Sequence, residues 1–316
     1  MALAEKLGTI PVRDEFTDLR AIYDSLQDTI KKMFQNVTLI NYSKSLAAKK
    51  IRELNRKIME VNIRTMIWAE RAARDSYKIG AERTEATLNA AKFEQVKIIP
   101  IENAVEIGVT VDLISRDMAK ANKTIIKSMK KYFNFMGKIN RRIAAKIQEQ
   151  DQELLSDADL FLIEDIIQSG YLAHEVRGKV SKRIYDILVD RIGEGNLIEI
   201  IDKNGKTIHY NPRKYAEMVA RTRLRELQTQ AVKNMCGAYG CDLVVWSTHD
   251  NPCPKCEPFE GRVFSLSGKH PDYPFLKDEP PLHPRCEHNI NPATNEERQY
   301  KEQELGILTS GFGGKL

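Results

Sequence analysis

The chain has 316 residues, of which 42% are hydrophobic, 29% charged and 7% aromatic. This composition suits a soluble protein with broad solvated helical faces and argues against an aromatic-rich β-sandwich, so we expect a mainly α body. The formal net charge of +5 permits an acidic partner such as DNA without requiring one. At about 100–200 residues per domain, two or three units are expected.

Targeting signals and cysteine usage indicate the compartment in which the protein is found. The N-terminus lacks a basic segment followed by an apolar one, and no run reaches the roughly 18 apolar residues of a membrane span. We therefore expect no membrane span and a cytosol-like compartment. The five cysteines all follow residue 235, which favours a local metal site over a disulfide framework. They are Cys236, Cys241, Cys253, Cys256 and Cys286.

The first half of the chain reads as long helices. Residues 13–92 are nearly free of Gly and Pro, and apolar positions three and four apart predict one stripe of a long helix within an intrachain bundle, with an oligomer as the alternative. A break at residues 97–100 precedes a second long helix at about 103–154, then shorter ones near 156–169 and 171–193. The stripe comprises Ile51, Leu54, Ile58, Val61, Thr65, Trp68 and Ala72.

The architecture changes after about residue 195. Asn204-Gly205 between the β-prone runs 197–201 and 206–210 predicts a hairpin. Asn211-Pro212 then predicts the start of a helix that runs to about Met235. Residues 242–247 are expected to form a strand that leads into the first cysteine pair.

These elements predict a mainly α protein with a small α+β C-terminal domain. We expect a helical body at 1–195. An α+β domain with a Cys/His metal module should follow at 196–295, and a loose, glycine-rich tail at 296–316.

The strongest chemical signal is a pair of Cys/His motifs. Cys253 and Cys256 form a Cys-x-x-Cys pair, and His283 with Cys286 forms a second. Three thiols and an imidazole suit tetrahedral zinc, and four protein ligands would make a closed structural site with no position for an activated water. His288 is an alternative ligand to His283.

Other interpretations of the cysteines remain open. The segment between the two pairs is longer than in common zinc fingers, so a β-hairpin or a loop must close it, and residues 260–264 could supply the turn and the returning strand. The cysteines could instead be reduced, partly buried thiols. A reactive dithiol is disfavoured, because the prolines around Cys253 indicate a loop and not a helix N-terminus. Cys236 and Cys241 are expected to be structural.

A basic stripe marks the second long helix. No Asp or Glu occurs between Met118 and Gln148, and most of the basic residues share one helical face, as contact with DNA phosphates would require. The alternative is a solvated face balanced by the acidic segment 150–165. The candidate DNA-binding residues are Lys120, Lys123, Lys127, Lys130, Lys131, Lys138, Arg141 and Arg142, with Lys146 further along and Tyr132, Phe133 and Phe135 among them.

Residues 205–295 resemble the C-terminal domain of phage minor capsid proteins, the group that includes the phage Mu head-morphogenesis protein. The resemblance rests on the order of several motifs and on an upstream Ala-Arg-Thr helix. The motifs are Val245-Trp246, Cys253-Pro254-Lys255-Cys256, Glu260-Gly261-Arg262-Val263-Phe264 and Pro280-Pro281-Leu282-His283-Pro284-Arg285-Cys286-Glu287-His288; the helix is Tyr215 to Arg223.

Two positions depart from the family pattern. Arg223 stands where the Mu-like branch has Glu, which leaves the role of that helix open. Cys286-Glu287-His288 replaces the usual Cys-Arg-Cys or Cys-Arg-His, which makes His288 a rival of His283. For Arg221 and Thr222 we expect a structural role, with an arginine tying the helix to the metal module.

The resemblance implies a low-copy head component that is not an enzyme. Such proteins associate with the portal, the capsid or the scaffold during assembly in the host cytoplasm. They then travel inside the virion, where they can touch packaged double-stranded DNA or assist its exit, and a homo-oligomer is possible. Two rival hypotheses are a metal-dependent nuclease, in which His249, His283 or His288 acts on a phosphodiester, and a cytosolic zinc protein that binds DNA non-specifically.

Overall fold

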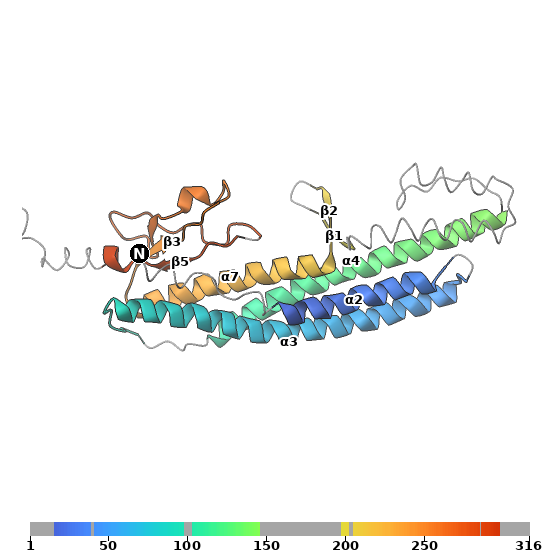
Figure 1. Cartoon of the computed structure of the whole chain (residues 1–316), viewed down its shortest axis with the longest axis horizontal. Helices are drawn as coiled ribbons and strands as arrows, with labels where there is room; N and C mark the ends of the chain where they lie inside the picture. The colour runs from blue at the N-terminus through green and yellow to red at the C-terminus, as the bar shows by residue number, and fades with distance from the viewer. Residues whose placement is uncertain are drawn as a thin grey trace, which may run out of the picture. The chain divides into compact units, whose positions relative to one another are not determined.

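The structure is a computed structural model that describes residues 16–38, 41–97, 103–145, 197–201, 205–284 and 286–297. Structural statements below concern these residues. In chain order the elements are α2 (Thr17–Asn36), α3 (Lys44–Ala90), α4 (Ala104–Ala145), β1 (Ile198–Ile201), β2 (Thr207–Tyr210), α7 (Pro212–Ala238), β3 (Leu243–Trp246), the 3-10 helix η2 (Glu257–Phe259), β4 (Val263–Ser265) and β5 (Ile290–Pro292) (Figure 1). The mainly α fold with a small C-terminal sheet is confirmed.

The chain forms two compact units, each built from two separate segments. The first unit takes residues up to Trp68 and from Ser115 to Glu217, and the second takes Ala69–Ile114 and residues from Met218 onward. The helices α3, α4 and α7 therefore each contribute to both units. The predicted boundary near residue 195 lies in a stretch outside the described residues and stays a prediction.

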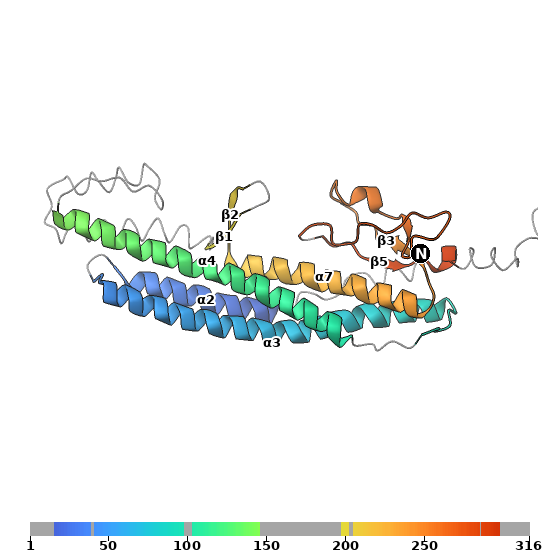
Figure 2. The ribbon, with the colours of Figure 1, turned by 180° about the vertical axis from the view of Figure 1, so that it is seen from behind.

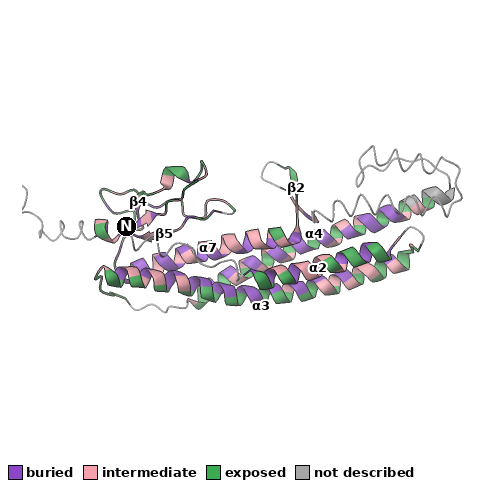
Figure 3. Cartoon of the chain, in the orientation of Figure 1, coloured by how far each residue is buried: buried purple, intermediate pink, exposed green. Residues whose placement is uncertain are grey.

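In the first unit, α2 packs beside the early part of α3 and the later part of α4 (Figures 1 and 2). The predicted α3 stripe is confirmed. Leu54, Ile58, Val61, Thr65 and Trp68 are buried and Ile51 is half-buried in this unit, and Ala72, the last residue of the stripe, is buried in the second unit. Buried and exposed positions alternate along α3 in Figure 3. Phe16, just before α2, lies with its ring centroid 5.6 Å from that of Trp68. The stripe therefore packs within the chain, as expected.

The Gly- and Pro-poor region at 13–92 contains a break that hydrophobic spacing did not reveal. After α2 ends at Asn36, the Asn41 side chain accepts a hydrogen bond from the Thr38 N–H at 2.8 Å and donates one to the Asn36 carbonyl at 2.9 Å. The Ser43 hydroxyl then accepts the Leu46 N–H at 3.1 Å, which caps the start of α3. Asn and Ser favour such local bonds, so these residues are the sequence signal for the break.

The helix α4 begins where Asn103 caps it. Its carboxamide oxygen accepts the N–H groups of Val105 and Glu106 at 3.2 and 3.3 Å. Further along, the buried Asn122 side chain donates to Asn62 of α3 at 2.8 Å, which fixes the alignment of the two helices in the first unit. The predicted extension of this helix to 154 and the shorter helices at 156–169 and 171–193 lie outside the described residues.

The predicted hairpin is present in the first unit. β1 and β2 are antiparallel, with Ile198 opposite Tyr210 and Ile201 opposite Thr207. Gly205 has φ of 78°, a left-handed conformation that glycine adopts at little cost. The predicted helix from Pro212 follows as α7, and an ion pair between Glu217 in its second turn and Arg20 of α2, at 2.8 Å, ties the start of α7 to α2.

In the second unit, α7 runs along the later part of α3 at close range. The Ser76 hydroxyl donates to the Leu224 carbonyl at 3.1 Å. A Cβ atom built on Gly80 would lie 3.1 Å from both Ala231 Cβ and the Gln228 carbonyl oxygen, so only glycine fits there without displacement. The Asn234 side chain of α7 also donates to the Tyr77 hydroxyl at 2.9 Å.

A three-stranded antiparallel sheet with the order β4-β3-β5 completes the second unit. The predicted strand at 242–247 is β3, and the predicted returning strand is β4, which places Val244 opposite Phe264. The buried Glu297 carboxylate accepts the N–H groups of Asp242 and Leu243 at 3.0 and 2.8 Å and so fixes the start of β3. Among the described helices, none has the length and apolar character that crossing a membrane requires.

Candidate metal centre

The first cysteine pair lies on a tight turn between β3 and η2. The N–H groups of Cys256 and Glu257 donate to the Cys253 carbonyl at 2.9 and 3.0 Å, which brings the two thiols onto the same side. Their sulfur atoms are 3.5 Å apart. Trp246, at the end of β3, is fully buried and stacks on Phe259 of η2 with ring centroids 4.9 Å apart, which anchors this turn to the sheet.

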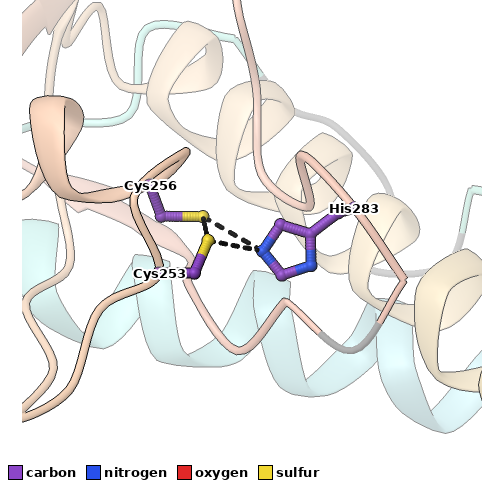
Figure 4. A group of neighbouring side chains, drawn as sticks. All are labelled: Cys253, Cys256 and His283. Atoms are coloured by element: carbon purple, nitrogen blue, oxygen red, sulfur yellow. Dashed lines mark hydrogen bonds between the residues drawn. The ribbon is translucent and has the colours of Figure 1, made fainter.

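The second pair closes on the first across the intervening loop. His283 Nε2 lies 3.0 Å from Cys253 Sγ and 3.3 Å from Cys256 Sγ, so that three ligand atoms point toward one another (Figure 4). Cys286 Sγ lies 3.8 Å from Cys256 Sγ. The expected approach of the two Cys/His motifs is therefore present in the structure.

His288 takes part in a second group of ligand atoms. Its Nδ1 atom is 3.6 Å from Cys286 Sγ. The ligand atoms of Cys256, Cys286 and His288 all lie within 4.8 Å of one another, as do those of Cys253, Cys256 and His283. Cys256 belongs to both groups, which together offer five donor atoms.

The spacing of these atoms fits a small tetrahedral ion. Zinc–sulfur bonds of about 2.3 Å and zinc–nitrogen bonds of about 2.0–2.1 Å imply edges of about 3.8 Å between sulfurs and about 3.5 Å between sulfur and nitrogen. The observed distances run from 3.0 to 3.8 Å. The group of Cys253, Cys256, His283, Cys286 and His288 could hold a metal ion.

Both imidazoles have the hydrogen bonding of metal ligands. His283 Nδ1 is 2.9 Å from the Pro284 carbonyl oxygen, which can only accept, so Nδ1 carries the proton and Nε2 offers its lone pair to the thiols. His288 Nε2 is 2.7 Å from a Glu260 carboxylate oxygen, which likewise leaves Nδ1 free to face Cys286. A carbonyl or carboxylate behind each ring is the arrangement that orients ligating histidines.

Glu260 is a member of the site that the sequence did not single out. Besides holding His288, the same carboxylate oxygen accepts the His249 N–H at 2.9 Å. The His288 bond, with a further contribution from His249, lowers the pKa of Glu260 against the effect of burial, so the carboxylate is ionised. In the sequence, Glu260 belongs to the predicted turn, beside Gly261, whose φ is 67°.

The two thiols of the first pair differ in acidity. Burial opposes ionisation of Cys253, but hydrogen bonds from the Cys256 thiol and from backbone N–H groups outweigh it and lower the pKa of Cys253 to about 7. Burial and the neighbouring thiols raise the pKa of Cys256 to about 12. Without a cation the cluster therefore holds one readily formed thiolate and resists a second, which a divalent ion would stabilise.

Comparison with known proteins bears on the same region. The family model of phage minor capsid protein 2 matches residues 161–292, and no curated protein and no solved structure matches the chain. This region is therefore similar to the phage minor capsid protein 2 family. The resemblance stated from the motifs is thereby confirmed. The described part of the minor capsid region carries the hairpin, α7, the sheet and the whole Cys/His group.

The α7 helix of the minor capsid region places an arginine near the second pair. Burial lowers the pKa of Arg225, while the charges of Cys286 and Glu287 oppose the shift. The Thr222 hydroxyl donates to the Met218 carbonyl of its own helix at 2.9 Å. The structural role expected of Arg221 stays a prediction.

The basic residues of α4 lie in the first unit, away from the cysteines in the sequence. Lys120, Lys123, Lys127, Lys130, Lys138 and Arg141 are exposed and Lys131 is half-buried, while the Arg142 side chain and the acidic segment 150–165 lie outside what the structure describes. Tyr132, Phe133 and Phe135 are buried, so they belong to the core and are not stacking surfaces for nucleic acid.

Proposed function

We propose that the protein is a low-copy internal component of a phage head, which associates with the portal, capsid or scaffold proteins during assembly in the host cytoplasm and acts structurally, not as an enzyme. The observation that carries this proposal is the match of residues 161–292 to the phage minor capsid protein 2 family. Quantitative mass spectrometry of purified virions tests it. A few protease-protected copies per particle are expected, and absence from the particle would overturn the proposal.

The metal that best fits the centre is zinc. Cys253, Cys256 and Cys286 would supply three thiolates, with His283 as the fourth ligand and His288 as its alternative. Soft thiolates and neutral imidazole at tetrahedral spacing favour zinc over oxygen-seeking cations. Four protein ligands leave no open position for substrate, so the ion would stiffen the turn and loops of the second unit.

Elemental analysis of protein purified without a histidine tag tests this centre, together with thermal melts in the presence and absence of a chelator. We expect one zinc per chain, lost in Cys253→Ser and in Cys286→Ser together with stability. Cys241→Ser is the matched control, because Cys241 lies outside the cluster and its Sγ atom bonds the Leu243 carbonyl at 3.5 Å, as a hydroxyl can also do. Full folding without metal would reject the centre.

The exposed face of α4 supports a second contact, with packaged duplex DNA. Lysines at 120, 123, 127 and 130 can each neutralise a phosphate, and binding would then fall with salt in proportion to their number. Replacing all four with Gln should lower the slope of log K against log salt by about 3.6. The same change at the exposed Lys31, Lys32, Lys44 and Lys49 is the control. Equal loss in both variants would refute a specific role for α4.

A metal-dependent nuclease is the alternative function, and one observation favours it. The His249 ring lies 4.3 Å from the His288 ring, and its Nε2 atom is 3.4 Å from the Ser247 hydroxyl, so an imidazole outside the five-donor group stands beside it. Plasmid digestion that needs a divalent cation and disappears in His249→Ala would replace the structural role with this one. Intact plasmid with the zinc-loaded protein would reject it.

A further inference from the structure

The C-terminal end of α7 carries two cysteines that lie outside the metal cluster. Cys236 and Cys241 are both buried in the second unit, and the Cys241 N–H donates to the Cys236 carbonyl at 2.8 Å. Within this turn the Gly240 N–H donates to the Gly237 carbonyl at 3.3 Å, and Gly240 has φ of 60°. These bonds form a Schellman motif, in which the residues at the two ends of the turn frequently bring their side chains into contact. In this chain both of those residues are cysteine.

The backbone bond limits how far apart the two cysteines can lie. One carbonyl, one N–H and the 2.8 Å hydrogen bond between them join the Cα atoms of Cys236 and Cys241. With standard bond lengths, this path allows a Cα–Cα distance of at most about 6.7 Å. Disulfides span about 4.4–6.8 Å between Cα atoms. The end of the helix therefore holds the pair within the range of a disulfide before any bond forms.

The two thiols also interact directly. A hydrogen bond with the Cys241 thiol, together with burial, raises the pKa of Cys236 well above its usual value, so Cys236 keeps its proton. The Cys241 thiol in turn donates to the Leu243 carbonyl at 3.5 Å. Because the thiolate is the reactive form of cysteine, Cys241 is the thiol placed to react first and Cys236 is the one placed to follow.

The turn between the two cysteines is open to a small solute. Gly237 and Gly240 are both exposed, although the cysteines on either side of them are buried. A Cβ atom built on Gly237 would have no atom of the described residues within 4 Å. A molecule as small as hydrogen peroxide can therefore approach the turn at a position that no side chain covers.

We propose that Cys236 and Cys241 are a site of reversible oxidation, at which a peroxide joins them by a disulfide that locks the end of α7 to the start of β3. The Cys241 sulfur attacks one peroxide oxygen, the O–O bond breaks, and the thiol proton leaves with the other oxygen as water. The Cys236 sulfur then attacks the Cys241 sulfur, and its proton leaves with the hydroxyl group as a second water. The peroxide gains two electrons, and each thiol loses one.

This disulfide would close a joint at which separate segments of the second unit meet. The Ala238 carbonyl, between the two cysteines, accepts the N–H groups of Val96 and Lys97 at 2.8 and 3.0 Å. A reducing cytosol keeps such thiols free, and oxidising surroundings let them pair. Because the bond restricts the unfolded chain, oxidation at this site should raise the Tm by about 4–8 °C. The proposal goes beyond the head-protein function and does not depend on the metal centre.

Peptide mapping of the zinc-loaded, full-length chain after brief exposure to hydrogen peroxide tests the site. Cleavage after Lys233 and before Asp242 releases residues 234–241, which hold both cysteines and none of the cluster thiols. After denaturation and alkylation, this peptide should lack two hydrogen atoms and carry no alkyl group. Reduction before alkylation should restore both thiols, because a disulfide is reversible and a sulfinic acid is not.

An internal control shows that the peroxide has acted. Met59 is 64% exposed and should become its sulfoxide in the same sample. If Met59 is oxidised while Cys236 and Cys241 are both alkylated, the two thiols are inert and the proposal is overturned. A disulfide from either of them to Cys253 would overturn it as well.

Thermal melts test whether the disulfide locks the joint. Cys241→Ser is the matched variant, because it keeps every other residue that peroxide can oxidise. The change in Tm on oxidation should be about 4–8 °C more positive in the wild type than in Cys241→Ser. Equal changes in the two proteins would overturn the lock.

Discussion

Two glycines within helices of the second unit should respond oppositely to the same substitution. Replacing glycine with alanine in a helix stabilises by about 0.8–1.0 kcal/mol, because the backbone loses less entropy on folding. At Gly108 of α4 no atom lies within 4 Å of the new Cβ, so Gly108→Ala should show much of this gain. At Gly80 of α3 the new Cβ meets Ala231 Cβ and the Gln228 carbonyl oxygen, each at 3.1 Å.

The close contacts at Gly80 determine whether alanine raises or lowers the free energy of unfolding there. Overpacking costs about 1–3 kcal/mol, which exceeds the propensity gain, so Gly80→Ala should destabilise by up to about 2 kcal/mol. The two variants should then differ by about 1–3 kcal/mol, or several degrees in Tm at about 2–4 °C per kcal/mol. Urea and thermal unfolding followed by circular dichroism measure both. Equal stabilisation by the two alanines would refute the close approach of α3 and α7.

The remaining predictions concern two carboxylates. Glu260→Gln removes the charge behind His288 and should weaken zinc binding about 10–100-fold in a competition titration with a chromophoric chelator. Glu257→Gln, at an exposed residue, is the control and should leave the zinc affinity unchanged. Equal zinc affinities of the wild type and Glu260→Gln would show that Glu260 does not orient a ligand. Burial opposes ionisation of Glu217, but the hydrogen bonds and charges of Arg20 and Arg213 outweigh it and lower the pKa of Glu217 below its usual value. The ionised Glu217 should stabilise the fold by about 1 kcal/mol. This stabilisation should be complete above the pKa that Glu217 has in the unfolded chain, and it should disappear as the pH falls through the lower pKa that Glu217 has in the folded chain. The Tm difference between wild type and Glu217→Gln should be constant near neutral pH and vanish in acid, and a difference that grows in acid would contradict this sign.

Local signals allowed much of the fold to be predicted. Asn204-Gly205 gave the hairpin because few other residues tolerate the backbone of a tight turn, and Asn211-Pro212 gave the start of α7. The Cys-x-x-Cys turn likewise needs only neighbouring residues, and its chemistry required a second pair nearby. These features depend on short stretches of sequence, and the structure has them where they were expected.

Features that depend on distant residues were missed. β5 contains Pro292, which lacks a backbone donor and reads poorly as a strand, yet it pairs with β3 at an edge of the sheet. Glu260 looked like a turn residue because its partner, His288, lies 28 residues away. Nothing in the spacing of Glu260 indicates that loop closure brings the carboxylate behind the imidazole.

The second unit also has a consequence for synthesis of the chain. Its first segment ends at Ile114, but its sheet is complete only when β5, which starts at Ile290, has been made. At about 5–20 residues per second, a ribosome needs roughly 10 to 35 s to cover that interval. Tyr77 and Leu88 of the early segment, both buried in the finished fold, must wait for partners during this time. Newborn chains are therefore open to aggregation for longer than a contiguous domain of the same size, and their yield should rise when chaperones that hold unfolded chains are abundant.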